Sequence, residues 1–166
     1  MNTSELLTDA LERVRESVTA TAEGLSADQL AHRPNGTGNS IGWLLWHLAR
    51  VQDDHVAQVA GTEQVWTSKG WAARFALPFE DKAIGYGQSS DEVSQVRVEA
   101  GLLTGYYEAV HARTLEYVGG LTDADLDEVV DRRWDPPVTL GVRLNSVVND
   151  DTQHAGQAAY VRGILP

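Results

Sequence analysis

Several stretches of the sequence repeat apolar residues at intervals of three and four, which is the spacing of one face of an α-helix. The N-terminal stretch shows the pattern most clearly, through Leu7, Leu11, Val14, Val18 and Ala22. Asn2 followed three residues later by Glu5 is typical of a capping box at a helix start. Alternation of apolar and polar residues, the mark of a half-buried strand, is almost missing. The chain is therefore restricted to helical architectures.

The same periodicity, bounded by glycine and proline, predicts four long helices. They are expected over residues 3–23, 40–60, 90–118 and 139–164. This pattern predicts an all-α fold, most economically a four-helix bundle. A length of 166 residues with 42% hydrophobic content fits one domain over residues 1–166. The segment WDPPVTL, residues 134–140, is too short to indicate a sheet.

Residues 61–90 break the helical period and predict a long irregular connection between helices two and three, with one helical turn in it. Connections of this length in a compact domain are usually functional or disordered. Aromatic side chains argue against disorder here. They are Trp66, Trp71, Phe75 and Phe79. The sequence leaves open whether they line a pocket or form a small satellite core.

Composition excludes several classes of function. Lys and Arg number 13 against 24 Asp and Glu, a formal net charge of −11, which argues against a nucleic-acid partner. With no cysteine, the chain has no disulfide, no thiolate nucleophile of its own and no Cys-ligated metal. The N-terminus is acidic rather than basic and then apolar, and no apolar run approaches the ~18 residues of a membrane span. We expect a cytoplasmic protein without a membrane partner.

Two polar residues interrupt the apolar stripe of the last helix. Asp150 and His154 lie four residues apart, so both project from one helical face, a spacing suited to gripping one metal ion. His47 interrupts an apolar run in the second helix in the same way. Two histidines and a carboxylate form a three-ligand site with open positions, the pattern of catalytic metals. The alternative is an ordinary ion pair beside a packed core histidine.

Other polar residues are weaker candidates. Asp151 lies three residues before His154 and is the fallback carboxylate ligand. His55 follows two acids and either supports a ligand or sits on the surface. His111 is expected to be structural or exposed. Arg143 and Arg162 could bind a carboxylate, although a solvated face is the default for both.

The fourth helix, TLGVRLNSVVNDDTQHAGQAAYVRG, and the WHLARV stretch resemble the DinB-like superfamily of four-helix metalloproteins. The likeness is to the mycothiol-dependent branch that includes maleylpyruvate isomerase. The family pattern has one histidine in the second helix and, much later, His or Glu, three residues, His and a Gly-Gln or Gly-His step. These positions fall on His47, Asp150 and His154, with Gly156-Gln157 after them. Where that branch has Glu, this chain has Asp150, whose side chain is shorter by one methylene group.

The resemblance implies a divalent metal on His47, Asp150 and His154, with zinc as the first expectation and nickel, manganese or iron as alternatives. It also implies a mycothiol-like thiol cosubstrate whose thiolate attacks a small electrophile, as an S-transferase or an isomerase. A homodimer is left open. The alternative function is a non-catalytic bundle whose buried polar network serves a small-ligand-binding or dimerisation module. A purely structural metal is a third reading.

Overall fold

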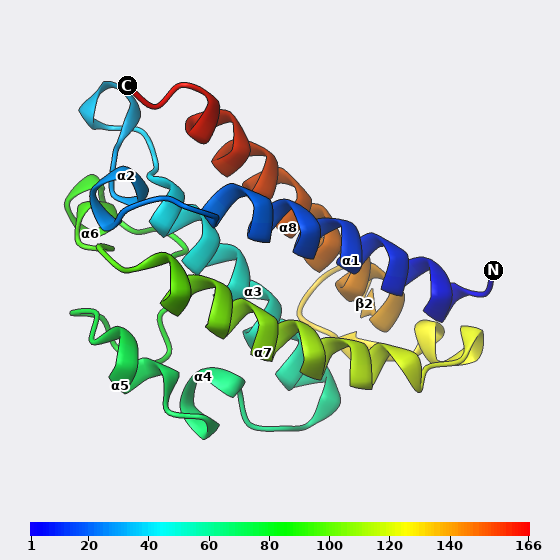
Figure 1. The fold of residues 1–166 in the computed structure, drawn as a ribbon. Coiled ribbons are helices and arrows are strands. Elements are labelled where there is room, and N and C mark those ends of the chain that lie inside the picture. Colours follow the sequence, from blue (N-terminus) through cyan, green and yellow to red (C-terminus); the bar gives the residue numbers. More distant parts are fainter.

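Long helices make up most of the protein, as the computed structural model of residues 1–166 shows (Figure 1). They are α1 (Thr3–Ala22), α3 (Ile41–Ala60), α7 (Ala100–Gly119) and α8 (Leu140–Gly163). The all-α four-helix bundle is therefore confirmed. The predicted capping box is present, since the Asn2 side chain accepts from the Glu5 amide and the Glu5 carboxylate accepts from the Asn2 amide.

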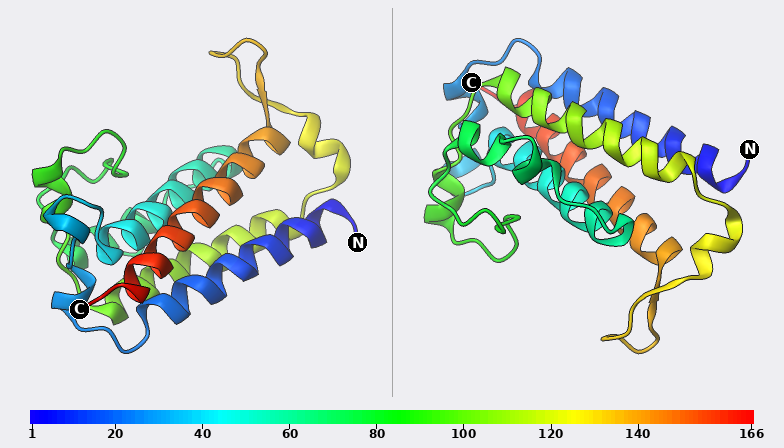
Figure 2. Two further views of the ribbon diagram at one scale, coloured as in Figure 1. Left: turned by 90° about the horizontal axis from the view of Figure 1, so that it is seen from above. Right: turned by 90° about the horizontal axis from the view of Figure 1, so that it is seen from below.

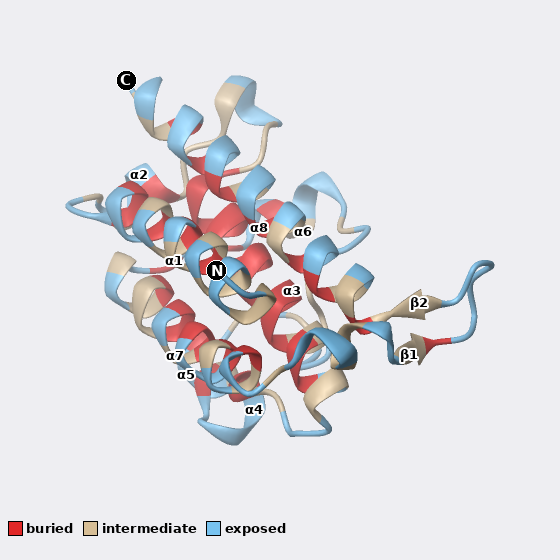
Figure 3. Ribbon diagram, turned by 90° about the vertical axis from the view of Figure 1, so that its right-hand side faces the viewer, coloured by how far each residue is buried: buried red, intermediate tan, exposed pale blue.

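The four helices pack as a bundle in which α1 and α3 each contact both α7 and α8. Successive long helices do not all run in opposite directions. α3 and α7 are parallel to each other and antiparallel to α1 and α8 (Figures 1 and 2). The buried residues lie on the inner faces of these helices (Figure 3). Two helices that run the same way need a connection that returns along the bundle, and residues 61–99 supply it.

The expected start of the third helix at residue 90 is wrong. Ser90–Ser94 form a separate short helix, α6, which is capped by Ser89, and α7 begins only at Ala100. Between them Val96 and Val98 are buried while their neighbours are exposed. Burial at every second residue belongs to extended chain and not to a helix, so packing of these two valines breaks the helix.

The long connection between the second and third long helices is also confirmed, with more helix than expected. It contains α4 (Val65–Ser68) and α5 (Trp71–Phe75) as well as α6. Trp66, Trp71 and Phe75 are buried in the main core, where all three rings pack around Tyr106 of α7. These three side chains therefore belong to the main core and not to a separate satellite core, whereas Phe79 packs against the core and also lines a cavity.

Shorter elements close the ends of the bundle: α2 (Ala27–Leu30), η1 (Pro34–Gly36) and η2 (Asp123–Asp127). The strands β1 (Val129–Asp131) and β2 (Val138–Thr139) pair antiparallel and form a hairpin that projects from the body (Figure 3). The expectation that residues 134–140 contain no strand was therefore wrong for the C-terminal part of that segment. Val138 and Thr139 pair with β1, a partner strand that the sequence did not reveal. No helix has both the length and the apolar character needed to span a membrane.

Candidate metal site

His47 sits on α3 with its ring held from two sides. The ring stacks on Trp43, one turn earlier, with centroids 4.6 Å apart and planes 13° apart. Its Nδ1 is hydrogen-bonded to the backbone carbonyl of Ile84, in the connection between α5 and α6. A carbonyl can only accept, so Nδ1 carries the hydrogen and Nε2 presents a free lone pair. The side chain is 6% exposed.

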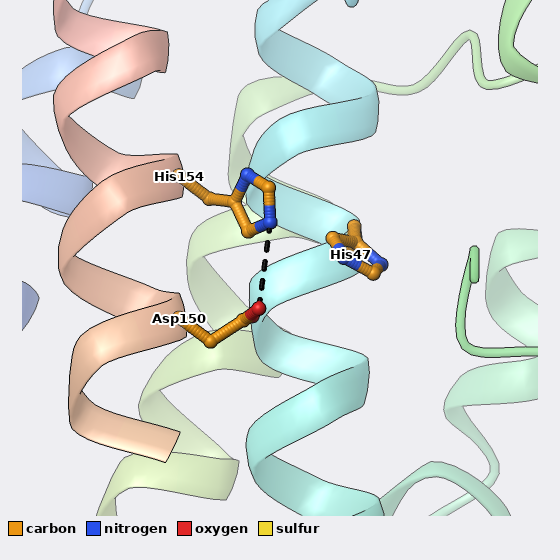
Figure 4. Close-up of side chains that lie close together, drawn as sticks. All are labelled: His47, Asp150 and His154. Atoms are coloured by element: carbon orange, nitrogen blue, oxygen red, sulfur yellow. Dashed lines mark ion pairs between the residues drawn. The ribbon is translucent and has the colours of Figure 1, made fainter. Parts of the chain in front are cut away.

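Asp150 and His154 face His47 from one turn of α8 (Figure 4). His154 Nε2 lies 3.6 Å from Asp150 Oδ1. His154 Nδ1 lies 3.0 Å from Oε1 of Gln157, one turn further along the helix. Because Nδ1 is engaged by Gln157, Nε2 is the ring nitrogen that faces Asp150 and the space between the helices. Their side chains are 34% and 19% exposed, so the cluster is reachable from solvent.

The three side chains fit a divalent metal. One ligand atom from each of His47, Asp150 and His154 lies within 4.8 Å of the others. The second carboxylate oxygen of Asp150, Oδ2, is buried and has no hydrogen-bond partner. Buried polar atoms are normally paired, and a cation would satisfy this one. Two imidazoles and a carboxylate are the donor set of open zinc sites.

The charges in the cluster also suit a metal. Burial lowers the pKa of His47 below its ordinary value, so its ring is neutral, as a metal ligand must be. Burial alone raises the pKa of Asp150, but the neighbouring rings of His154, His47 and His55 outweigh it, and the pKa lies below normal. The Asp150 carboxylate in turn raises the pKa of His154. In the free protein Asp150 is thus an anion facing a protonatable ring.

The fallback carboxylate lies elsewhere. Asp151 is fully buried in the core, neither of its oxygens has a hydrogen-bond partner, and it is not part of the cluster. Burial raises the pKa of Asp151 well above its usual value. Burial therefore favours the protonated form of this carboxyl, and the side chain is not placed among the ligand atoms of the cluster.

The remaining candidates have structural contacts. His55 lies outside the cluster, and its Nδ1 accepts a hydrogen bond from Arg143. Arg143 is 11% exposed and also pairs with Asp131 of the hairpin, so the expectation of a solvated face was wrong. His111 is buried against Glu12, as a structural histidine. Arg162 donates to the carbonyls that end α1.

Sequence reasoning assigned no orienting role to the groups that hold the two histidines, although Gln157 was named as part of the family pattern. Trp43 and Gln157 lie one turn from His47 and His154 respectively, and that spacing could have identified both. The Ile84 carbonyl had no such signal, because any residue type provides a backbone acceptor.

Comparison with known proteins identifies the family. The family model for mycothiol S-transferases matches residues 6–165. The chain belongs to the mycothiol S-transferase family. The resemblance to the DinB-like superfamily is thereby confirmed. A crystal structure of a conserved protein from Enterococcus faecalis is similar along the whole length, with a TM-score of 0.93 and 31% sequence identity over 99% of this chain and 98% of that chain. The search of curated proteins gave no match.

Proposed function

We propose that this member of the mycothiol S-transferase family is a metal-dependent enzyme that transfers a low-molecular-weight thiol, of the mycothiol type, to a small electrophile. The observation that carries the proposal is the convergence of His47, Asp150 and His154 on one point. Both histidines use Nδ1 for a hydrogen bond, which leaves Nε2 as the nitrogen available to a ligand. An ordinary ion pair between Asp150 and His154 needs no such third group.

The chain's own residues have distinct tasks in this proposal. His47 and His154 would supply neutral nitrogen ligands, and Asp150 would supply a negative oxygen that offsets part of the ion's charge. A bound divalent metal lowers the pKa of a thiol, so that the thiolate is present at neutral pH. Because the chain has no cysteine, the thiol must come from a cosubstrate. The partly exposed side of the cluster, at Asp150 and His154, leaves room for it.

Zinc is the metal we propose, since two imidazoles and a carboxylate suit it, with nickel, manganese and iron as competitors. A cavity of about 560 Å³ adjoins the site at Gln157, the residue that orients His154. Its lining includes the apolar surfaces of Pro34, Leu44 and Tyr160. We propose that the electrophile binds there, one helical turn from His154.

The proposal is tested first by metal content. Untagged wild type, His47→Ala and His154→Ala are prepared identically and analysed by elemental mass spectrometry, with circular dichroism to verify the fold. We expect about one equivalent of a first-row metal in wild type and its loss in both variants. The His111→Ala variant is the control, because this histidine lies against Glu12 and outside the cluster.

Thiol transfer is then assayed with mycothiol and 1-chloro-2,4-dinitrobenzene. The sulfur forms a bond to the ring carbon, chloride leaves and the thiol proton passes to solvent. We expect turnover that requires the metal and disappears in His154→Ala. A wild type that stays empty after incubation with zinc, nickel and manganese would support the non-catalytic bundle. A metal whose removal unfolds the chain, with no turnover when it is loaded, would show a structural ion.

A further inference from the structure

Three residues of α3 share one stripe and hold the same segment of the long connection. Trp43, His47 and Arg50 follow each other at intervals of four and three, so their side chains lie on one face. Trp43 Nε1 donates to Gln88 Oε1 at 2.7 Å. His47 bonds the carbonyl of Ile84. Arg50 contacts the backbone of residues 81–83, just upstream of Ile84. The segment of residues 81–88 therefore runs antiparallel to α3 and is held at both of its ends.

Arg50 makes the upstream attachment from a fully buried position. Its Nε donates to the Ala83 carbonyl at 3.1 Å, and Nη2 donates to the Asp81 carbonyl at 3.2 Å. The same guanidinium donates to Gln64 Oε1 at 2.8 Å and to the Tyr106 hydroxyl at 3.1 Å. The planar guanidinium has five N–H groups in a rigid fork, and here they join α3 and α7 to the connection.

The segment is pressed closely onto the His47 ring. Gly85, next to Ile84, has a φ of +92°, a conformation that residues with a side chain rarely adopt. A Cβ added to Gly85 would lie 2.6 Å from His47 Nδ1 and 3.1 Å from the Trp46 ring. The glycine is therefore needed for the Ile84 carbonyl to reach the histidine.

We infer that Arg50 is a positioning residue of the site, which holds residues 81–88 so that the Ile84 carbonyl fixes the tautomer and ring orientation of His47. The residue lies one turn from His47 and outside the cluster of ligand atoms. It acts through two backbone carbonyls, Asp81 and Ala83, that immediately precede the acceptor. The consequence for metal affinity rests on the proposed function, whereas the effect on the His47 tautomer does not.

The chemical reason is that an imidazole can bind a metal through only one nitrogen at a time. A free histidine exchanges its hydrogen between Nδ1 and Nε2. A fixed acceptor at Nδ1 keeps Nε2 available and raises its basicity. Loss of such a supporting partner typically weakens metal binding by about 10–100-fold.

Two variants test the inference by independent routes. Arg50→Met removes the donors but keeps a long apolar stem. Gly85→Ala leaves Arg50 intact and forces the segment away from the His47 ring. The control is Gln52→Leu, which removes another fully buried polar side chain of α3. Gln52 donates to Thr114 of α7 and makes no hydrogen bond to residues 81–88. Circular dichroism and thermal unfolding verify that each variant is folded.

The first readout is the tautomer of His47 in metal-free protein, from long-range proton–nitrogen NMR spectra of the histidine rings. The second is the zinc Kd, measured by competition with a chromophoric chelator. In wild type and Gln52→Leu we expect a single Nδ1–H tautomer at His47. In Arg50→Met and Gly85→Ala we expect mixed tautomers and zinc binding weakened about 10–100-fold.

The outcomes separate the two proposals. Unchanged His47 tautomer and zinc Kd in folded Arg50→Met would overturn the positioning role. If Arg50→Met does not fold, Arg50→Lys replaces it, because lysine keeps the positive charge beside Asp53 but lacks the planar fork that donates to the Asp81 and Ala83 carbonyls. An unchanged His47 tautomer in folded Arg50→Lys would overturn the positioning role. A wild type that binds no metal would refute the proposed function, while the metal-free spectra would still judge the role of Arg50.

Discussion

Asp150 and Asp151 are consecutive residues of α8, yet one carboxylate faces His47 and His154 while the other is sealed in the core without a hydrogen-bond partner. An α-helix turns by about 100° per residue, which is enough to move a side chain from the groove between helices to the bundle interior. The two residues are therefore a matched pair for experiment, equal in chemistry and one position apart.

The first prediction uses this pair to test the ligand set. We expect Asp150→Asn to lose metal, because an amide supplies no negative charge to the ion, and Asp151→Asn to keep it. Isothermal titration with zinc measures both. Equal loss in the two variants would indicate that Asp151 reaches the site, contrary to its buried position.

The second prediction concerns pH and stability. Burial raises the pKa of Asp151 well above 3.8, so the folded state keeps a proton that the unfolded state releases. The unfolded state then binds fewer protons, and stability falls as pH rises above about 4. The loss is up to about 1.4 kcal/mol per pH unit until the folded-state pKa is reached.

Urea unfolding of metal-free wild type and Asp151→Asn at a series of pH values between 4 and 8 measures how Asp151 changes the free energy of unfolding with pH. The difference in unfolding free energy between the two proteins should grow in favour of the variant as pH rises. Parallel curves would mean that Asp151 is already ionised in the folded state.

The third prediction uses two adjacent tyrosines of α7. The Tyr106 hydroxyl accepts from Arg50 and donates to Asp53 at 2.8 Å, whereas the buried Tyr107 hydroxyl has no partner. Tyr106→Phe leaves two buried charged groups short of a partner and should cost about 1–3 kcal/mol. Tyr107→Phe should change stability by less than about 1 kcal/mol. Chemical denaturation measures the unfolding free energy of both variants. A similar loss of stability in the two would contradict the hydrogen bonds described for Tyr106.

The fourth prediction concerns the hairpin. Arg143 of α8 pairs with Asp131 of β1 at 3.4 Å and donates to Gln58 of α3 at 2.8 Å. Arg143→Met should therefore loosen β1 and β2 and speed amide hydrogen exchange in residues 129–139. Arg132→Met removes an exposed charge of the same hairpin and serves as the control. Unchanged exchange in Arg143→Met would show that the hairpin is held by its own strand pairing.

Much of the fold could be predicted because local signals agree with the tertiary structure. The start of α1 has a capping box, and α3 ends at Gly61 in the left-handed conformation that glycine favours. The start of α7 could not be predicted, because residues 96–99, which follow α6, have helix-compatible composition and only the burial of Val96 and Val98 makes them extended. That single-domain organisation covers residues 1–166 stays a prediction.

The candidate site was predictable in part. Helical spacing and the family resemblance led to His47, Asp150 and His154, which the structure brings together. Spacing could not decide between Asp150 and Asp151, since residues three and four positions before His154 both lie near its face. The contribution of residues 81–88 was invisible, because it depends on backbone carbonyls whose position is set by the tertiary fold.

The shared direction of α3 and α7 has a consequence for how such a site can arise. After α3, which has 20 residues and is about 30 Å long, the chain must return that distance before α7 can begin. An up-and-down bundle would join the same helices by a short turn and would have no chain to spare over His47. Here the return path is an unavoidable product of topology, and the carbonyl of Ile84 and the glycine beside it belong to that path. Deleting the return segment to shorten the protein would therefore remove the contact that orients His47.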